Sequence, residues 1–171
     1  MQDYNNAAEV EEEDGPISVT LTWEEMKEAA TVGICRNVES LRQGDKNAHG
    51  YDGSDTWTVN IEGACAELAF AKAMGIKGDG GINTYKAADV GNDWQVRWSP
   101  EHGNRLIVRS NDSDDHRFVL VSGQSPSFRI QGWRRGRDAK RPYWREAPCG
   151  RPAAYFVPKN CLRPIDPILA A

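Results

Sequence analysis

One short stretch of the chain, from Asp89 to Arg97, gathers acidic, amide and basic side chains around a turn. Gly91-Asn92 is a turn signal, and residues 94–98 (Trp-Gln-Val-Arg-Trp) alternate apolar and polar residues as a half-buried strand does. Side chains two positions apart share one face of a strand, so Gln95 and Arg97 lie together on the polar face. An acid at the end of one strand therefore faces a polar-x-basic pair on the next, and the planar guanidinium of Arg97 suits a phosphate.

A second acid that calls for a partner lies upstream, in a helix predicted from about Ile61 to Met74 with Gly75 as its stop. This helix is apolar around most of its axis, so we expect it to be buried on most sides. Glu67 has no cation three or four residues away, and an unpaired carboxylate in such a helix is costly unless a cation or a metal outside the helix satisfies it. The alternative is a rim carboxylate that faces solvent. Glu62 is typical of a first-turn acid favoured by the helix dipole.

A basic and aromatic segment, residues 129–145, is the strongest nucleic-acid signal in the sequence. Its cations, set against Asp138 alone, are Arg129, Arg134, Arg135, Arg137, Lys140, Arg141 and Arg145, and its interleaved aromatic residues are Trp133, Tyr143 and Trp144. Basic side chains attract phosphates, and exposed rings offer stacking faces to bases. The alternative is that the tryptophans belong to the core and the arginines form a solvated face.

The charge of the chain is unevenly distributed. The net charge is -4, yet residues 1–14 hold six acids and no Lys or Arg, so the rest of the chain has two more basic than acidic residues. The low pI therefore does not exclude nucleic acid as a partner. The length of 171 residues suits one ordinary domain, so we expect an acidic, disordered tail over residues 1–16 and a single domain over 17–171.

Several kinds of site and location are disfavoured. The four cysteines show no C-x-x-C spacing, which argues against a zinc site, and the cluster from Asp112 to His116 lacks the glycine and terminal Glu of a calcium loop, so it is predicted to be a solvated turn. P-loop, G-x-S-x-G and H-E-x-x-H patterns are absent. Because the N-terminus is acidic and no apolar run is long enough to span a membrane, we expect a cytoplasmic protein without a membrane partner.

The elements that must position these residues can be read from periodicity. Thr22-Trp23-Glu24-Glu25 has the form of a capping box and opens an amphipathic helix that ends near residue 43, with Trp23, Met26, Ala30, Ile34, Val38 and Leu41 as its apolar positions. A polar loop follows over residues 44–56. Strands are predicted at 82–90, 94–98, 105–109, 118–121, 127–131 and 153–157, and residues 118–121 are apolar on both faces, as in a central strand. We therefore expect an α/β (α+β) sandwich, with a central mixed β-sheet of about five strands flanked by helices.

The constellation of a helix acid, an acid at a strand end, a turn and a polar-x-basic pair resembles the core of the PD-(D/E)xK nuclease superfamily. The similarity covers roughly residues 61–131, and the whole chain resembles a phage-type member of that group, which would act in the cytoplasm of the host cell. The resemblance implies a restriction-endonuclease-like fold, Mg²⁺ (or Mn²⁺) held by the acids, and hydrolysis of phosphodiester bonds.

Position by position, Glu67 matches the helix acid of the family, with Glu62 as its substitute, and Asp89 matches the metal-bridging Asp. Gln95 stands where the family usually has Asp or Glu, Arg97 where it usually has Lys, and Ala88 where it has Pro. A Gln oxygen can bind Mg²⁺ but brings no charge, and Arg97 stays protonated, so it can hold a phosphate but cannot serve as a base. The resemblance implies a metal held by Asp89, Gln95, Glu67 or Glu62.

Three hypotheses follow. The first is a metal-dependent nuclease that acts on DNA, with Glu67, Asp89, Gln95 and Arg97 as catalytic residues. The second is a nuclease-fold protein that binds nucleic acid without cutting it, through Arg129, Arg134, Arg135, Arg137, Lys140, Arg141 and Trp133. The third is a structural or host-interaction protein in which the site is vestigial.

Overall fold

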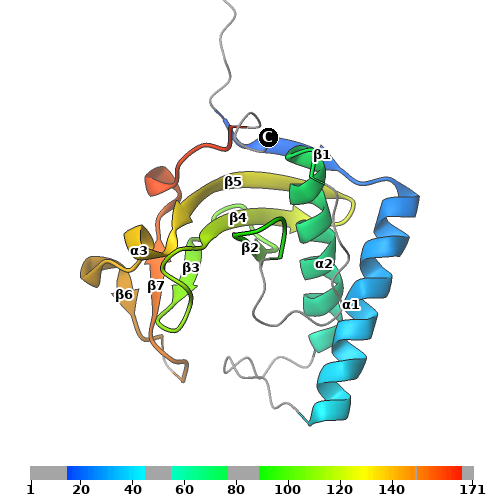
Figure 1. The fold of residues 1–171 in the computed structure, drawn as a ribbon, viewed down its shortest axis with the longest axis horizontal. Coiled ribbons are helices and arrows are strands. Elements are labelled where there is room, and N and C mark those ends of the chain that lie inside the picture. The colour runs from blue at the N-terminus through cyan, green and yellow to red at the C-terminus, as the bar shows by residue number, and fades with distance from the viewer. Residues whose placement is uncertain (1–14, 45–54, 77–88, 149, 167–171) are drawn as a thin grey trace, which may run out of the picture.

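The structure, a computed structural model, describes residues 15–44, 55–76, 89–148 and 150–166. Three predictions lie largely or wholly outside these residues: the acidic tail, the polar loop after the first helix, and the strand expected over 82–90. The described chain is a mixed α/β structure with two open sheets, of four and three strands, and its two long helices lie at one side (Figure 1).

The first helix, α1 (Trp23–Gln43), begins and ends where its capping signals predict. Thr22 accepts a hydrogen bond from the Glu25 backbone N–H, the Glu25 carboxylate accepts one from the Thr22 N–H, and Gly44 ends the helix in a left-handed conformation. The side that packs is different from the one predicted: Ala29, Gly33 and Asn37 are buried, not the apolar positions at 34, 38 and 41.

The reason for this rotation of α1 is the second helix, α2 (Thr56–Ala73), which crosses α1 most closely at Gly33. A Cβ atom at Gly33 would lie 2.6 Å from the Asn60 carbonyl oxygen, so only glycine admits this approach. Asn60 also donates a side-chain hydrogen bond to Asn37 at 3.0 Å. The helix α2 starts five residues earlier than the periodicity predicts, because Asp55 caps it by accepting from the Thr58 N–H.

The larger sheet has the strand order β1-β5-β4-β2. Its strands are β1 (Ile17–Thr20), β2 (Trp94–Ser99), β4 (Arg117–Gln124) and β5 (Ser127–Arg135). The strand β2 runs parallel to β4, whereas β5 is antiparallel to both β4 and β1. Among the described residues, β2 is therefore an edge strand of this sheet.

A second, smaller sheet corrects the prediction of one central sheet. Its order is β3-β7-β6, with β3 (Leu106–Arg109), β7 (Ala154–Val157) and β6 (Arg145–Glu146), all antiparallel. The strands predicted at 105–109 and 153–157 are present, yet they pair with one another and not with the larger sheet. Short helices lie on this side of the molecule: the α-helix α3 (Gly136–Ala139) and the 3-10 helices η1 (Pro142–Trp144) and η2 (Lys159–Cys161).

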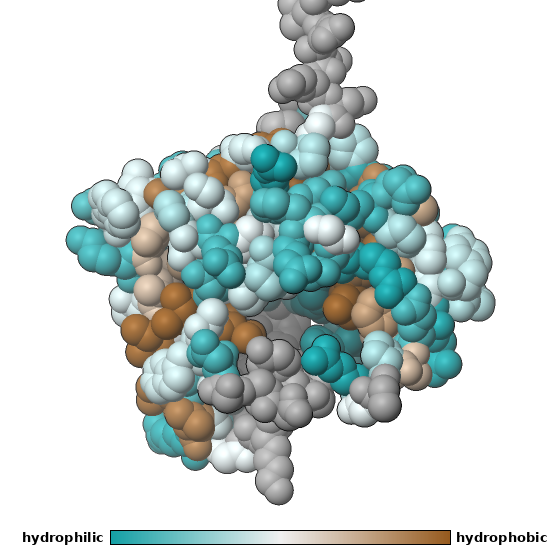
Figure 2. All heavy atoms as spheres, turned by 180° about the vertical axis from the view of Figure 1, so that it is seen from behind, coloured by the Kyte–Doolittle hydropathy of each residue, from teal (hydrophilic) through white to brown (hydrophobic). Residues whose placement is uncertain are grey.

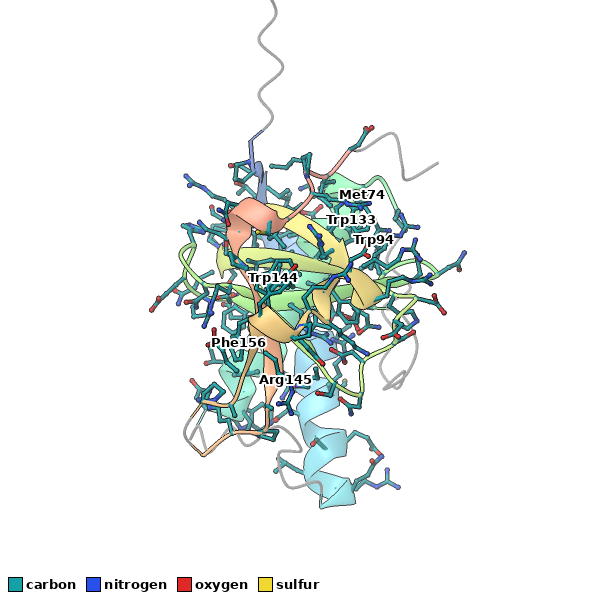
Figure 3. The ribbon with its side chains drawn as sticks, turned by 90° about the vertical axis from the view of Figure 1, so that its left-hand side faces the viewer. Met74, Trp94, Trp133, Trp144, Arg145 and Phe156 are labelled. Atoms are coloured by element: carbon teal, nitrogen blue, oxygen red, sulfur yellow. The ribbon has the colours of Figure 1, made fainter. Side chains whose placement is uncertain are left out.

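Two apolar clusters cover the two faces of β4, which confirms the prediction of a central strand. Val119 and Val121 face α2 in the larger cluster, whereas Phe118 and Leu120 face the small sheet in the second. Figure 3 shows Met74, Trp94 and Trp133 grouped together, and these buried side chains belong to the larger cluster. The layers are thus α1 on α2, α2 on the larger sheet, and the small sheet against the far face of β4 (Figure 1).

Candidate functional site

Asp89 lies along the edge of β2 that faces away from β4, held there by the turn predicted at Gly91-Asn92. Its backbone N–H donates to the Trp94 carbonyl at 2.8 Å, and Val90 bridges to Trp94 across the turn. The Asp89 carboxylate then accepts a hydrogen bond from the Val96 N–H at 2.7 Å. Since the N–H and C=O of one strand residue point to the same side, the Val96 carbonyl faces the same edge. Asp89 therefore lies beside a backbone carbonyl, away from β4.

Glu67 on α2 pairs with a cation from another helix, as its sequence context predicts. Both carboxylate oxygens accept from the Arg36 guanidinium of α1, each at 2.7 Å, and the two side chains are 24% and 19% exposed, Arg36 first. A bidentate, half-buried pair of this kind fixes the position of both groups. The cation comes from a residue thirty-one positions away, on the face of α1 that packs against α2.

The packing of α2 on β2 places Glu67 within electrostatic range of Asp89. Phe70, one turn after Glu67, contacts Trp94 edge to face with ring centroids 5.0 Å apart. Burial of Asp89, together with the negative charge of Glu67, raises the pKa of Asp89 to about 6. The Val96 hydrogen bond and the charges of Arg97 and Arg36 act in the opposite direction. Three of the residues predicted to form a site thus influence one another: Glu67, Asp89 and Arg97.

Arg97 leaves the plane of the sheet toward the small-sheet side. Its Nη2 donates to Asp112 at 2.9 Å, its guanidinium lies 4.9 Å above the Phe118 ring, and Nη1 lies 3.5 Å from the Val96 carbonyl oxygen. Its Nε is buried and has no hydrogen-bond partner among the described residues. Gln95, half-buried, is on the same face of β2. One face of β2 therefore presents an amide and a fixed guanidinium with a spare donor.

Glu62, the other acid of α2, is engaged elsewhere. Its carboxylate accepts from the Ser125 backbone N–H at 2.9 Å and from the Ser125 hydroxyl at 2.6 Å. This contact ties α2 to the turn between β4 and β5. The hydrogen-bond partners of Glu62 assign it a structural role in this structure, apart from the Glu67 and Asp89 pair.

The donor atoms at the β2 edge differ from those of a closed metal site. No three His, Cys, Asp or Glu side chains of the described residues converge on one point. Asp89, Glu67 and the Val96 carbonyl offer oxygen ligands, which are those that Mg²⁺ and Mn²⁺ accept, whereas the predicted ligand Gln95 lies on the face of β2 opposite to α2. Such a set fits a cation that keeps several waters, provided that Glu67 exchanges Arg36 for the ion.

The basic and aromatic segment is less available than its composition predicts. The prediction of Trp133 as a stacking residue is wrong, because Trp133 is only 8% exposed, contacts Trp94 with ring centroids 5.4 Å apart, and lies in the core. Arg134 is also turned inward, where it donates to the Cys161 carbonyl at 2.6 Å and lies over the Trp144 ring. Tyr143, by contrast, is 73% exposed.

Acids of the loop between β3 and β4 neutralise much of this segment. Lys140 pairs with Asp114 at 2.6 Å, Arg137 pairs with Asp115, and Arg135 donates to the Asp115 carbonyl at 3.0 Å. Arg141 lies 3.6 Å from Asp138. Arg129 is exposed and makes no side-chain hydrogen bond or ion pair within the described part of the chain. The predicted solvated turn at 112–116 is thus an acidic counterpart to the arginines.

Sequence reasoning missed two residues next to the site, Arg36 and Asp112. Arg36 follows Gly33 by three positions and belongs to the contact face of α1, but periodicity predicts a different face, so no usable signal in the sequence pointed to it. Asp112 falls within the predicted solvated turn. Its carboxylate accepts hydrogen bonds from the Arg97 guanidinium, at 2.9 Å, and from the Arg109 N–H, at 2.7 Å. The contact with Arg97 joins two separate segments of the chain, so the spacing of residues in the sequence could not predict it.

The chain matches no protein-family model, no curated protein and no solved structure. Among the described residues, no helix is long and apolar enough to cross a membrane.

Proposed function

We propose that this protein is a metal-dependent nuclease with a restriction-endonuclease-like fold, and that it hydrolyses phosphodiester bonds in DNA at the edge of β2 that carries Asp89. The observation that carries the proposal is the meeting of Glu67 and Asp89 from different elements. Burial of Asp89, and after it the charge of Glu67, raises the pKa of Asp89 to about 6. Two partly buried carboxylates that interact disfavour each other's charge, and a cation near both would relieve this.

In this proposal, Asp89 and Glu67 hold Mg²⁺ or Mn²⁺ with the Val96 carbonyl, while Gln95 lies on the other face of β2. The ion would supply Lewis acidity toward a phosphate and lower the pKa of a bound water. The protein supplies the orientation: the Val96 N–H fixes one Asp89 oxygen, and the packing of Phe70 on Trp94 sets the distance between α2 and β2.

Two arginines lie near the two acids and have different roles. Arg97 is held by Asp112 and Phe118, so its remaining N–H groups are presented in a fixed orientation suited to phosphoryl oxygens. Arg36 neutralises Glu67 when no ion is bound. The edge of β2 lies between α2 and the small sheet (Figure 1).

The test is cleavage of supercoiled plasmid and linear DNA in Mg²⁺ or Mn²⁺, with Asp89→Asn and Glu28→Gln compared with the native chain. Asn retains an oxygen for the Val96 N–H but removes the charge, so we expect cutting to fall at least a hundredfold. Glu28 is an exposed acid of α1 and its replacement should leave cutting unchanged. Equal cutting by native and Asp89→Asn protein, or none by the native chain on any substrate, would sink the proposal.

A second candidate function is nucleic-acid binding without cleavage, and a specific observation favours it. Arg36 already occupies both oxygens of Glu67, Gln95 adds no charge, and Arg97 replaces a potential base, so the site carries two fixed cations without any metal. Each of these cations is paired with an acid, so a phosphate would be held there by hydrogen bonds from the guanidinium groups rather than by net positive charge.

Fluorescence anisotropy with labelled DNA and RNA in EDTA distinguishes this second candidate. It predicts binding that weakens steeply with salt, that needs no divalent ion, and that Arg129→Gln reduces severalfold, because Arg129 is exposed and unpaired among the described residues. Nucleic-acid affinity that appears only when Mg²⁺ or Mn²⁺ is added would exclude it and favour the nuclease.

A further inference from the structure

The helix α1 exposes a line of apolar side chains that its packing on α2 does not use. Trp23, Ile34, Val38 and Leu41 are 72%, 42%, 49% and 64% exposed, and they are half of the exposed large apolar residues in the described chain. Trp23 and Leu41 are eighteen residues apart, or about five turns, so they lie on one line along the helix with the other two between them. We call these four residues the α1 stripe.

The stripe is an apolar surface on the outer helix of the molecule. Figure 2 shows apolar surface exposed on the side of the molecule where α1 lies. The contact with α2 is made instead through Ala29, Gly33 and Asn37, on another side of α1. Extended apolar patches on a protein surface are typical of interaction sites, because their burial is favourable by roughly 25 cal/mol per Å².

Two exposed charges beside the stripe indicate what covers it. Glu24 and Arg42 are also eighteen residues apart, so they lie on one line along α1, at opposite ends. Glu24 makes no side-chain contact within the described residues, and Arg42 is 80% exposed with Glu39 at 3.6 Å. If two α1 helices pack antiparallel, each Arg42 meets Glu24 of the other copy, and residue 33, midway between them, places Ile34 near the two-fold axis.

We propose that the protein is a homodimer in which two copies pair through the α1 stripe, with α1 antiparallel to α1 and two symmetric Glu24 to Arg42 contacts. A two-fold interface must be complementary to itself, and the stripe meets this requirement: it has apolar side chains at both ends and near its middle, with Lys27 between Trp23 and Ile34, and it is acidic beside one end and basic beside the other. This proposal is independent of the proposed nuclease activity.

The experiment is sedimentation velocity of the full chain between about 1 and 100 μM, with Glu24→Arg and Arg42→Glu measured separately and as a mixture. Each variant alone would oppose like charges twice, so we expect its dimer affinity to fall at least tenfold. In the mixture both contacts are restored, because the two arginines of one variant face the two glutamates of the other at positions 24 and 42. Circular dichroism verifies that each variant keeps its helices, and Ile34→Glu should be monomeric.

Three outcomes would overturn the proposal. One is a native chain that stays monomeric over the whole range. Another is a native dimer that Ile34→Glu leaves intact, because the interface would then lie elsewhere. The last is a dimer in which the charge variants associate as well alone as they do mixed, which would exclude the antiparallel arrangement.

Discussion

At the scale of the residue, Asp89 carries an unfavourable charge in the folded state. Its pKa is raised from 3.8 to about 6, chiefly by burial and then by Glu67. A carboxyl group with a raised pKa favours folding below its unfolded pKa, and this contribution is lost as the pH rises through about 6. Asp89→Asn removes the charge while an oxygen still accepts from Val96.

We therefore expect Asp89→Asn to be more stable than the native chain by up to about 3 kcal/mol at pH 8, with the difference shrinking toward zero near pH 4. Urea unfolding at a series of pH values measures it. A variant that is less stable at pH 8 would contradict the account of Asp89. A gain in stability also means that any loss of activity in this variant is not due to unfolding.

Arg36 is the second residue whose replacement is informative. Arg36→Met leaves Glu67 half-buried without its bidentate partner, so we expect a loss of about 1–3 kcal/mol in the absence of metal. If Mn²⁺ occupies the space between Glu67 and Asp89, it should recover more stability in this variant than in the native chain. Denaturant unfolding with and without Mn²⁺ tests this, and an equal effect of Mn²⁺ on both proteins would argue against a shared position.

At the scale of the element, the crossing of α1 and α2 at Gly33 sets where Arg36 meets Glu67. Gly33→Ala would place a Cβ atom 2.6 Å from the Asn60 carbonyl oxygen and from the Ile61 Cα, so we expect a loss of about 1–3 kcal/mol. Gly63→Ala is the matched control: Gly63 is also helical, a Cβ atom added there would have nothing within 4 Å, and the variant should gain about 0.5–1 kcal/mol. Thermal unfolding of both variants measures whether each substitution lowers or raises stability. A loss of stability at both positions would refute the explanation by close helix approach.

The elements also show what the sequence alone could predict. The α1 boundaries, its capping box, β2 and the two-sided burial of β4 follow from local signals, namely caps, periodicity and apolar runs. The face of α1 that packs, the separation of β3 and β7 into their own sheet, and the burial of Trp133 depend on contacts between distant segments. For the candidate site, the need of Glu67 for an outside cation was predictable, but its identity as Arg36 was not.

At the scale of the whole molecule, the charges are arranged in compensating groups. The acidic loop between β3 and β4 pairs with Lys140 and Arg137, whereas Asp89 at the β2 edge is disfavoured by the nearby charge of Glu67. The proposals of a restriction-endonuclease-like fold and of nuclease activity both depend on this edge. The central claim is accordingly that Glu67 and Asp89 form a site for a divalent cation.

Isothermal titration calorimetry with Mn²⁺ at pH 7.5 tests that claim most directly, on the native chain, Asp89→Asn, Glu67→Gln and the control Glu28→Gln. We predict one ion per native chain, unchanged binding in the control, and at least tenfold weaker binding in the two site variants, because each removes one of the two charged ligands. No binding to the native chain, or equal binding to all four proteins, would contradict the claim.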